Sequence, residues 1–187
     1  GKHAAFLATC KKLNWPLDSY LKGNHPLQIE IFRIISELLE IPVNELNAER
    51  DDCGAPTLYL KLTEMSKLYA LLSSSENAEL EQISRAITTN PLMISDNYKF
   101  DTEIIKASHG QVIGKGGAEG IQCLCKVNEG IGLALKVEDG SKRAKHAVSL
   151  HLLKQLEWIS DLRIQDIEEK VFKLSEGVRI EVKGKLK

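Results

Sequence analysis

The chain has 187 residues, of which 43% are hydrophobic and 27% charged, and its formal net charge is −1. A balance of 25 basic against 26 acidic residues argues against a nucleic-acid partner or an anionic membrane surface. The sequence contains no apolar run of membrane-spanning length and opens without a signal-peptide pattern, so we expect a soluble protein. We predict one domain over residues 1–187.

The four cysteines, Cys10, Cys53, Cys123 and Cys125, form no C-x-x-C pair. We therefore expect free thiols and a cytoplasmic protein. The chain starts at Gly1 rather than at a methionine, and helical sequence follows within a few residues. We expect it to be the C-terminal portion of a longer protein.

The first third of the chain is mainly helical in pattern. A buried helix is predicted over residues 4–13 and a second helix from Pro26 to the residues before Pro42. Residues 51–56 have the composition of a turn, and the alternation in residues 58–62 predicts a strand. A third helix is predicted over residues 64–72.

The middle of the chain predicts helices over residues 77–88 and 102–107, followed by a short strand over residues 111–115. Residues 121–137 alternate on both sides of Asn128–Glu129–Gly130, which predicts a β-hairpin. Gly132 and Ala134 are small, as expected where a helix packs closely against a sheet.

The last third predicts a long helix that begins at Gly140–Ser141, with an apolar ridge of Ala144, Val148, Leu152, Leu156 and Ile159. A further helix is predicted over residues 165–174 and an edge strand over residues 178–182. The predicted class is α/β (α+β), with a mixed, largely antiparallel sheet flanked by helices.

Three places could carry chemistry. Lys115 ends a predicted strand and is followed by glycines, which suits a carboxylate or an oxyanion; a glycine-rich turn with a solvated lysine is the plain alternative. Residues 139–143 form an ordinary turn and helix N-cap in the plain interpretation. Arg143 lies in the first helical turn, where a cation opposes the helix dipole, and pairing with a carboxylate of the protein or of a substrate would explain it. Cys53 lies between an acid and a glycine. Such a cysteine can be a metal ligand or a nucleophile, but a buried thiol is the commoner case.

The residues alone do not predict a reaction. The five histidines are scattered, His151 is expected in the core, and Cys123 and Cys125 share one face of a strand, where packing is the simpler interpretation.

Five motifs in order resemble the thermolabile, rhizobial-type asparaginases, and they cover the chain nearly from end to end. The matching segments read GKHA at 1–4, HPLQ at 25–28, DDCGAP at 51–56, KGGAEG at 115–120 and GLALKVEDGSKRA at 132–144.

The resemblance implies a serine β-lactamase-like fold and hydrolysis of L-asparagine to L-aspartate and ammonia, with a homodimer as the assembly. It implies a catalytic role for Lys115 and substrate contacts by Arg143, Glu119 and Gly117. The family builds a zinc site from two cysteines and a lysine, and by motif match Lys2 and Cys53 fall on two of these ligands. Such a lysine must be neutral to bind metal.

The sequence also departs from the family. Gly1 follows the position of the second cysteine ligand by two residues, and Asp52 replaces a glycine. Gly116 provides no hydroxyl after Lys115. The family's Ser-x-x-Lys nucleophile belongs to its N-terminal half, so we predict a chain that is inactive alone and binds zinc weakly. A glutaminase-type amidohydrolase and a non-catalytic amino-acid-binding or dimerisation fragment are the alternatives.

Overall fold

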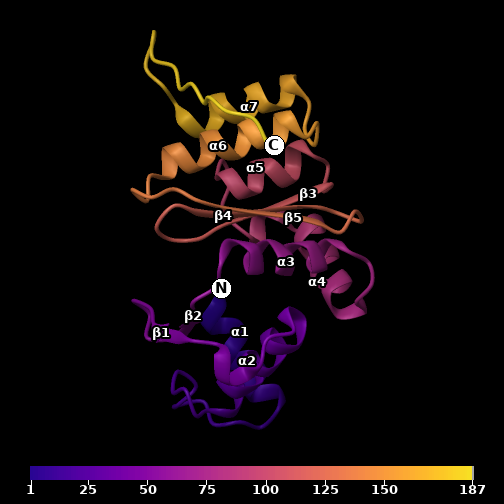
Figure 1. The fold of residues 1–187 in the computed structure, drawn as a ribbon, viewed down its shortest axis with the longest axis vertical. Helices are drawn as coiled ribbons and strands as arrows, with labels where there is room; N and C mark the ends of the chain where they lie inside the picture. Colours follow the sequence, from indigo (N-terminus) through magenta and orange to yellow (C-terminus); the bar gives the residue numbers. More distant parts are fainter. Residues whose placement is uncertain (187) are drawn as a thin grey trace. The chain divides into compact units, whose positions relative to one another are not determined.

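A computed structural model describes residues 1–186, and the chain forms two compact units, Gly1–Lys61 and Leu62–Lys187. The first unit contains two helices and a small hairpin, and the second contains a three-stranded sheet between helices. This mixture confirms the predicted α/β class, with antiparallel pairing in both sheets (Figure 1). The single domain over residues 1–187 stays a prediction.

The first unit is organised around helix α2. His25 caps this helix, because its Nδ1 accepts a 3.1 Å hydrogen bond from the Leu27 N–H. Pro26 occupies the first helical position, and Glu40 ends the helix in a left-handed conformation. The elements of this unit are α1 (Lys2–Lys12), α2 (Pro26–Leu39), the 3₁₀ turn η1 (Val43–Glu45), β1 (Ala48–Arg50) and β2 (Pro56–Leu58).

Two predictions for this part of the chain were wrong. Helix α1 was expected to be buried, yet Cys10 is its only buried residue. The strand predicted over residues 58–62 is instead β2, Pro56–Leu58, because the turn after Asp51 places Thr57 opposite Glu49. Leu62 already belongs to the next helix.

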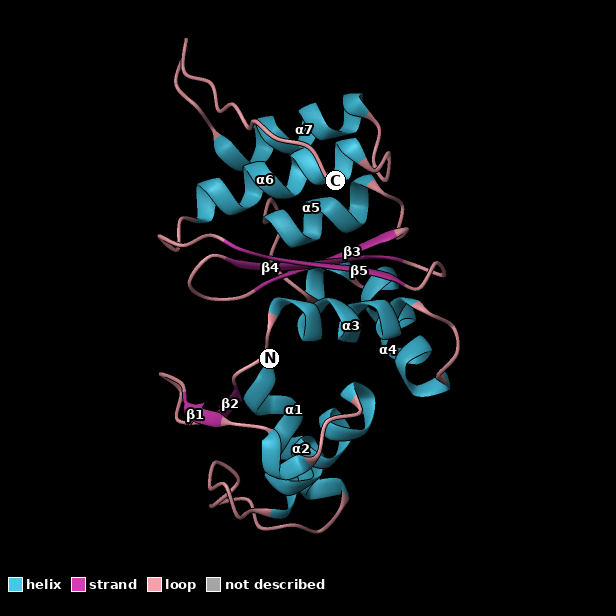
Figure 2. Cartoon of the chain, viewed as in Figure 1, coloured by secondary structure: helices cyan, strands magenta, loops and turns pink. Residues whose placement is uncertain are grey.

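The second unit has three layers, which Figure 2 shows by secondary structure. The sheet has the order β3-β4-β5, with α3 and α4 on one face and α5, α6 and α7 on the other (Figure 1). Its elements are α3 (Leu62–Ser73), α4 (Ala78–Thr89), the 3₁₀ turn η2 (Pro91–Met93), α5 (Phe100–Ala107), β3 (Val112–Gly116), β4 (Ile121–Lys126), β5 (Ile131–Lys136), α6 (Lys142–Gln155) and α7 (Asp161–Phe172).

Close packing of α3 on β5 explains the small residues of that strand. A Cβ atom at Gly132 would lie 2.1 Å from the Ser66 carbonyl oxygen and 2.4 Å from the Ala70 nitrogen. The helix backbone therefore occupies the space of a side chain, which confirms the predicted close approach of a helix. On the other face, the core contains Phe100, Ile104, Val112, Leu124, Leu150, Leu153, Ile164 and Ile167.

Helix α6 begins where predicted but turns another face inward. Ser141 caps it by accepting a 3.2 Å hydrogen bond from the Ala144 N–H. The predicted ridge is right only in part. Leu156 and Ile159 do pack in the core, but they follow the end of the helix at Gln155, and within the helix a neighbouring face is the buried one. The buried residues are Lys145, Ala147, Ser149, Leu150 and Leu153.

The residues that follow α7, 173–186, form the C-terminal segment, which contacts α6. The strand predicted over residues 178–182 is wrong, because this segment forms no strand. It is held by Gly184, whose carbonyl oxygen contacts His151 Nε2 and Gln155 Nε2, each at 2.9 Å. His151 is therefore a partner of this segment rather than a core residue. Among the described residues, the structure contains no helix with the length and apolar character needed to cross a membrane.

Candidate functional site

Asp51 is the centre of a small polar cluster in the first unit. Its Oδ2 accepts a 2.7 Å hydrogen bond from Lys2 Nζ, and its Oδ1 accepts one of 2.7 Å from the Cys53 thiol. Oδ1 also accepts from the N–H groups of Cys53 at 3.0 Å and Ala55 at 3.2 Å. The structure therefore brings together Lys2 and Cys53, the two residues that motif matching had paired.

The tight turn of the hairpin positions Asp51. Its N–H donates to the Ala55 carbonyl at 3.1 Å, and its own carbonyl accepts from the Gly54 N–H at 2.8 Å, where φ of Gly54 is +80°. The hydrogen bonds from Cys53 and Lys2 lower the pKa of the Asp51 carboxyl below its ordinary range. The same Asp51 bond raises the pKa of Lys2.

The next question is whether Cys53, Asp51 and Lys2 could bind the zinc ion that the motif match implies. A thiolate and a carboxylate are both zinc ligands, so Cys53 and Asp51 suit that ion. Lys2 has a raised pKa and donates to Asp51, so its amine must lose a proton before it can bind zinc. The described residues contain no group of three or more His, Cys, Asp or Glu side chains with metal-site geometry. Cys53 and Asp51 are donor types that zinc accepts, and a zinc site at this turn stays a prediction.

Lys115 lies in the second unit, at the end of β3. Its side chain is half exposed, and its Nζ donates to the Gly116 carbonyl at 2.5 Å. The Asp101 Oδ2 atom lies 3.9 Å from the same nitrogen. The predicted catalytic lysine is therefore accessible and has a carboxylate from α5 beside it.

Asp101 of α5 and Gln122 of β4 form a buried hydrogen-bonded pair beside Lys115. Asp101 Oδ2 accepts a 2.9 Å hydrogen bond from the Gly116 N–H, and its Oδ1 accepts one of 2.9 Å from Gln122 Nε2. Gln122 is fully buried, and its Oε1 has no hydrogen-bond partner among the described residues. Alternation in β4 did not predict a buried amide at this position.

Lys145 is a buried cation that the sequence did not single out. It is 4% exposed, and its Nζ donates to the carbonyls of Gly117 at 3.3 Å and Ile121 at 3.1 Å. Burial is the main cause that lowers the pKa of Lys145, and the charge of Lys115 lowers it further, whereas Asp101 opposes the change. The sequence offered one indication of this role: Lys145 lies one turn into the predicted helix that follows the glycine-rich loop and hairpin.

The loop after Lys115 differs from the expectation in one respect. The Gly117 N–H donates to the Ile121 carbonyl at 2.9 Å, so this predicted substrate contact is already engaged. Glu119 is exposed with φ of +51°, and its carbonyl accepts a hydrogen bond from Lys136 Nζ. The N–H groups of Ala118 and Glu119 donate to no group in residues 1–186, which leaves them available to an anion.

Arg143 lies in the first turn of α6 and is exposed. It makes no ion pair with any described carboxylate, so its expected pairing within the protein is not seen in residues 1–186. Its contact with a substrate carboxylate stays a prediction.

The four cysteines are free thiols, as predicted. Burial raises the pKa of Cys123 to about 11 and that of Cys125 to about 12. Both thiols therefore stay protonated near neutral pH and serve the packing of β4, whereas Cys53 is exposed.

One Ser-x-x-Lys sequence is present, at Ser19–Lys22, and it had been missed. It lies in the turn between α1 and α2, where the Lys22 N–H donates to the Ser19 carbonyl at 2.9 Å. The two side chains share no hydrogen bond. This pair consequently lacks the contact through which a lysine activates a serine.

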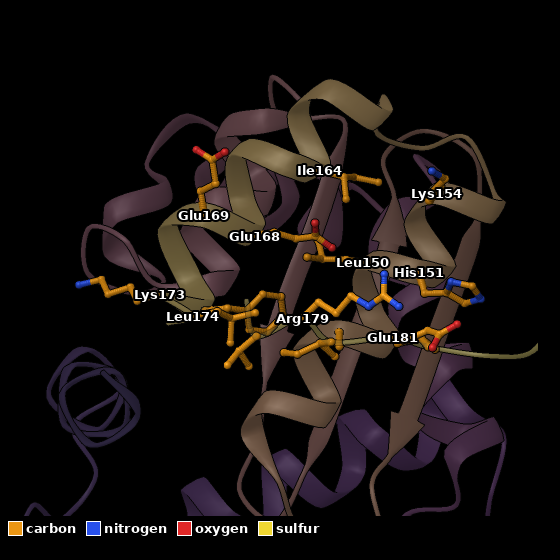
Figure 3. A pocket seen from close by; sticks show the side chains of 15 residues that line it. Leu150, His151, Lys154, Ile164, Glu168, Glu169, Lys173, Leu174, Arg179 and Glu181 are labelled. Atoms are coloured by element: carbon orange, nitrogen blue, oxygen red, sulfur yellow. The ribbon is translucent and has the colours of Figure 1, made fainter. Parts of the chain in front are cut away.

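One cavity of the second unit is lined by none of the predicted site residues. It has a volume of about 550 Å³ and lies between α6, α7 and the C-terminal segment. Figure 3 shows Leu150, Ile164 and Leu174 in its wall, with Arg179 and Glu181 from the covering segment. Because none of the predicted site residues lines it, we assign it to the packing of the C-terminal segment.

Comparison with known families gives a match over the entire chain. The family model described as L-asparaginase II matches residues 1–187. A search of curated proteins found no match.

Proposed function

The chain belongs to the L-asparaginase II family, and we propose that it contributes to the hydrolysis of L-asparagine to L-aspartate and ammonia. The match over residues 1–187 carries this proposal. It includes both polar sites, the one around Asp51 and the one around Lys115. Family membership supports an amidohydrolase that acts on a small molecule, and the substrate is the finer part of the proposal.

Lys115 has the properties of an electrostatic stabiliser. Its half-exposed ammonium lies at the end of β3, and the loop that follows carries the backbone N–H groups of Ala118 and Glu119, which have no hydrogen-bond partner in residues 1–186. An amide substrate develops negative charge on its carbonyl oxygen during attack, and preorganised donors of this kind stabilise that charge. We assign Lys115 this role and assign the loop N–H groups to the oxyanion or to a substrate carboxylate.

The other three residues predicted to contact the substrate would bind or position it rather than stabilise the developing charge. The exposed guanidinium of Arg143 is free to bind a substrate carboxylate in a bidentate manner. Glu119, also exposed, would accept from the substrate ammonium. Gly117 acts through its backbone, which holds the loop closed through Ile121. A homodimer stays a prediction.

The zinc site remains a proposal. Cys53 and Lys2 would hold the ion, with Asp51 beside both, and the metal would supply Lewis-acid polarisation of a bound oxygen. Within this chain, Asp51 holds the thiol and the ammonium in place, and its bonds to the hairpin turn keep them oriented.

We also propose that residues 1–187 do not turn over asparagine alone. The sole Ser-x-x-Lys sequence, Ser19–Lys22, forms a turn without a bond between its side chains. Without an activated nucleophile, the donors around Lys115 have no attacking group to assist.

An ammonia-release assay tests both proposals. Residues 1–187 are incubated with L-asparagine and with L-glutamine, and Lys115→Ala is the matched control. We expect no ammonia above the control, together with a higher melting temperature in L-asparagine than in L-glutamine. Turnover by the unmodified chain would refute its inactivity, and equal melting in both amino acids would refute asparagine as the substrate.

A further inference from the structure

We propose that Lys145 is a positioning residue for Lys115, on which it acts through the shared carboxylate of Asp101 and through the loop that follows β3. The inference rests on the proposed function for what Lys115 does in the reaction. Its structural content, a coupling between two lysines across Gly116, does not depend on that function.

The first link is a carboxylate placed between two cations. Asp101 Oδ2 lies 3.9 Å from Lys115 Nζ. The position that a Cβ atom of residue 116 would take is 3.5 Å from Asp101 Oδ2 and 2.8 Å from Lys145 Nζ. The absence of a side chain at Gly116 is therefore what allows the buried ammonium to approach the carboxylate that Lys115 also faces.

The second link is a count of charges. Two lysines and one aspartate leave one positive charge uncompensated when both amines are protonated. Lys115 is half exposed, so water stabilises its charge, whereas Lys145 is buried. Two further groups of α6 interact with Lys145: the charge of Lys142 lowers the pKa of Lys145, and the pKa of His146 is lowered mainly by burial and further by the charge of Lys145. The uncompensated positive charge therefore disfavours the protonated form of Lys145.

The third link is the unpaired oxygen of Gln122. The amine of Lys145 donates to two carbonyls, so a third N–H of the protonated amine needs another acceptor. Gln122 Oε1 is buried without a partner among the described residues and lies 3.1 Å from the same Cβ position. Its amide nitrogen already binds Asp101. If the protonated Lys145 amine donated to this oxygen, it would act on the same amide group that binds Asp101.

The fourth link is the loop itself. Lys145 Nζ binds the carbonyls of Gly117 and Ile121, the two residues that close the loop through the Gly117 N–H. This loop carries the N–H groups of Ala118 and Glu119, which donate to no group in residues 1–186. Lys145 consequently holds the two ends of the loop that follows Lys115.

Nuclear magnetic resonance of residues 1–187 labelled with ¹³C,¹⁵N-lysine tests the coupling. The ¹³Cε shift of Lys145 is followed against pH in the parent chain and in Lys115→Met. Because Lys115 repels the Lys145 charge, its removal should move the Lys145 titration midpoint to higher pH. Asp101→Asn should move the midpoint the other way. Lys126→Met removes a charge from the last residue of β4; it is the matched control and should leave the midpoint in place.

An unchanged Lys145 midpoint in Lys115→Met would overturn the proposal. A purely structural lysine would give that result, because Lys115 is exposed and its loss leaves the packing of Lys145 intact. Lys145→Met supplies the reciprocal measurement: the Lys115 side-chain signals should shift, and they should not shift in Lys126→Met. If Lys145→Met does not fold, the Lys115→Met titration still decides. No ammonia is measured, so this result stands or falls separately from asparagine hydrolysis.

Discussion

Residue 116 has no side chain because Lys145 occupies the space beside it: a Cβ atom at Gly116 would lie 2.8 Å from Lys145 Nζ. Carbon and nitrogen atoms do not approach so closely without a bond. A side chain at position 116 therefore requires the Lys145 amine to move away from its place beside β3. Lys115 lies 3.9 Å from Asp101 Oδ2, and the charge of the same Asp101 opposes the lowering of the Lys145 pKa that burial causes.

Gly116→Ala should destabilise the chain, because the new methyl group must displace Lys145 from its two carbonyl acceptors. We expect a loss of about 1–3 kcal/mol in the free energy of unfolding, measured by urea denaturation. Gly23→Ala is the control, since no atom lies within 4 Å of the added Cβ. In the Lys145→Met background the cost of Gly116→Ala should fall. Equal costs in both backgrounds would contradict this account of Gly116.

Gly132→Ala should be more severe. Its Cβ would meet the backbone of α3, 2.1 Å from the Ser66 oxygen, so no rotation of a side chain relieves the clash. We expect a loss of about 3 kcal/mol or more, again with Gly23→Ala for comparison. A variant as stable as that control would show that α3 does not pack on β5 in this way.

His146 should make stability depend on pH. Its ring stacks on Phe100, with centroids 4.0 Å apart, and burial lowers its pKa from 6.5 to about 4. Between these values the unfolded chain binds a proton that the folded chain does not. The contribution to stability is present above pH 6.5 and is lost as the pH falls toward 4.

The test compares His146→Phe with the parent by urea denaturation at pH 7 and pH 4.5. The parent should lose about 1–2 kcal/mol more than the variant, a discounted figure because the ring is part exposed. Identical losses would mean that the ring titrates alike in the folded and unfolded chains.

Zinc should bind weakly and at the hairpin turn. Cys53 and Lys2, with Asp51 beside them, provide few ligands, so we expect affinity in the micromolar range or weaker by competition with a chromogenic chelator. Cys53→Ala should reduce the affinity about tenfold or more, and Lys2→Ala should weaken binding relative to Lys11→Ala on the same helix. Tight binding that survives Cys53→Ala would place the metal elsewhere.

Much of the second unit could be predicted because its signals are local. The alternation on both sides of Asn128–Gly130 indicates a hairpin, and Ser141 caps α6 by its own hydroxyl. Gly132 likewise indicated close packing of a helix before the helix was known. Each of these inferences needs only residues that are near in sequence.

The remaining features depend on residues that are distant in sequence. The role of Asp51 requires Lys2, 49 residues earlier, and the sequence directed attention to Asp52 instead. Lys145 reads as a surface lysine until the inward face of α6 is known, and that face differs from the predicted ridge. The strand predicted over residues 178–182 has the right alternation, but its backbone finds no strand to pair with.

One measurement tests the central claim, that Lys115 and its loop bind L-asparagine in a chain that does not cleave it. Residues 1–187 are mixed with L-asparagine labelled with ¹⁵N in its side-chain amide. We expect amide shifts in Ala118 and Glu119 that are absent in Lys115→Ala, with the ligand signal intact after prolonged incubation. The appearance of ¹⁵N-ammonium, or loop signals that ignore asparagine, would contradict the account.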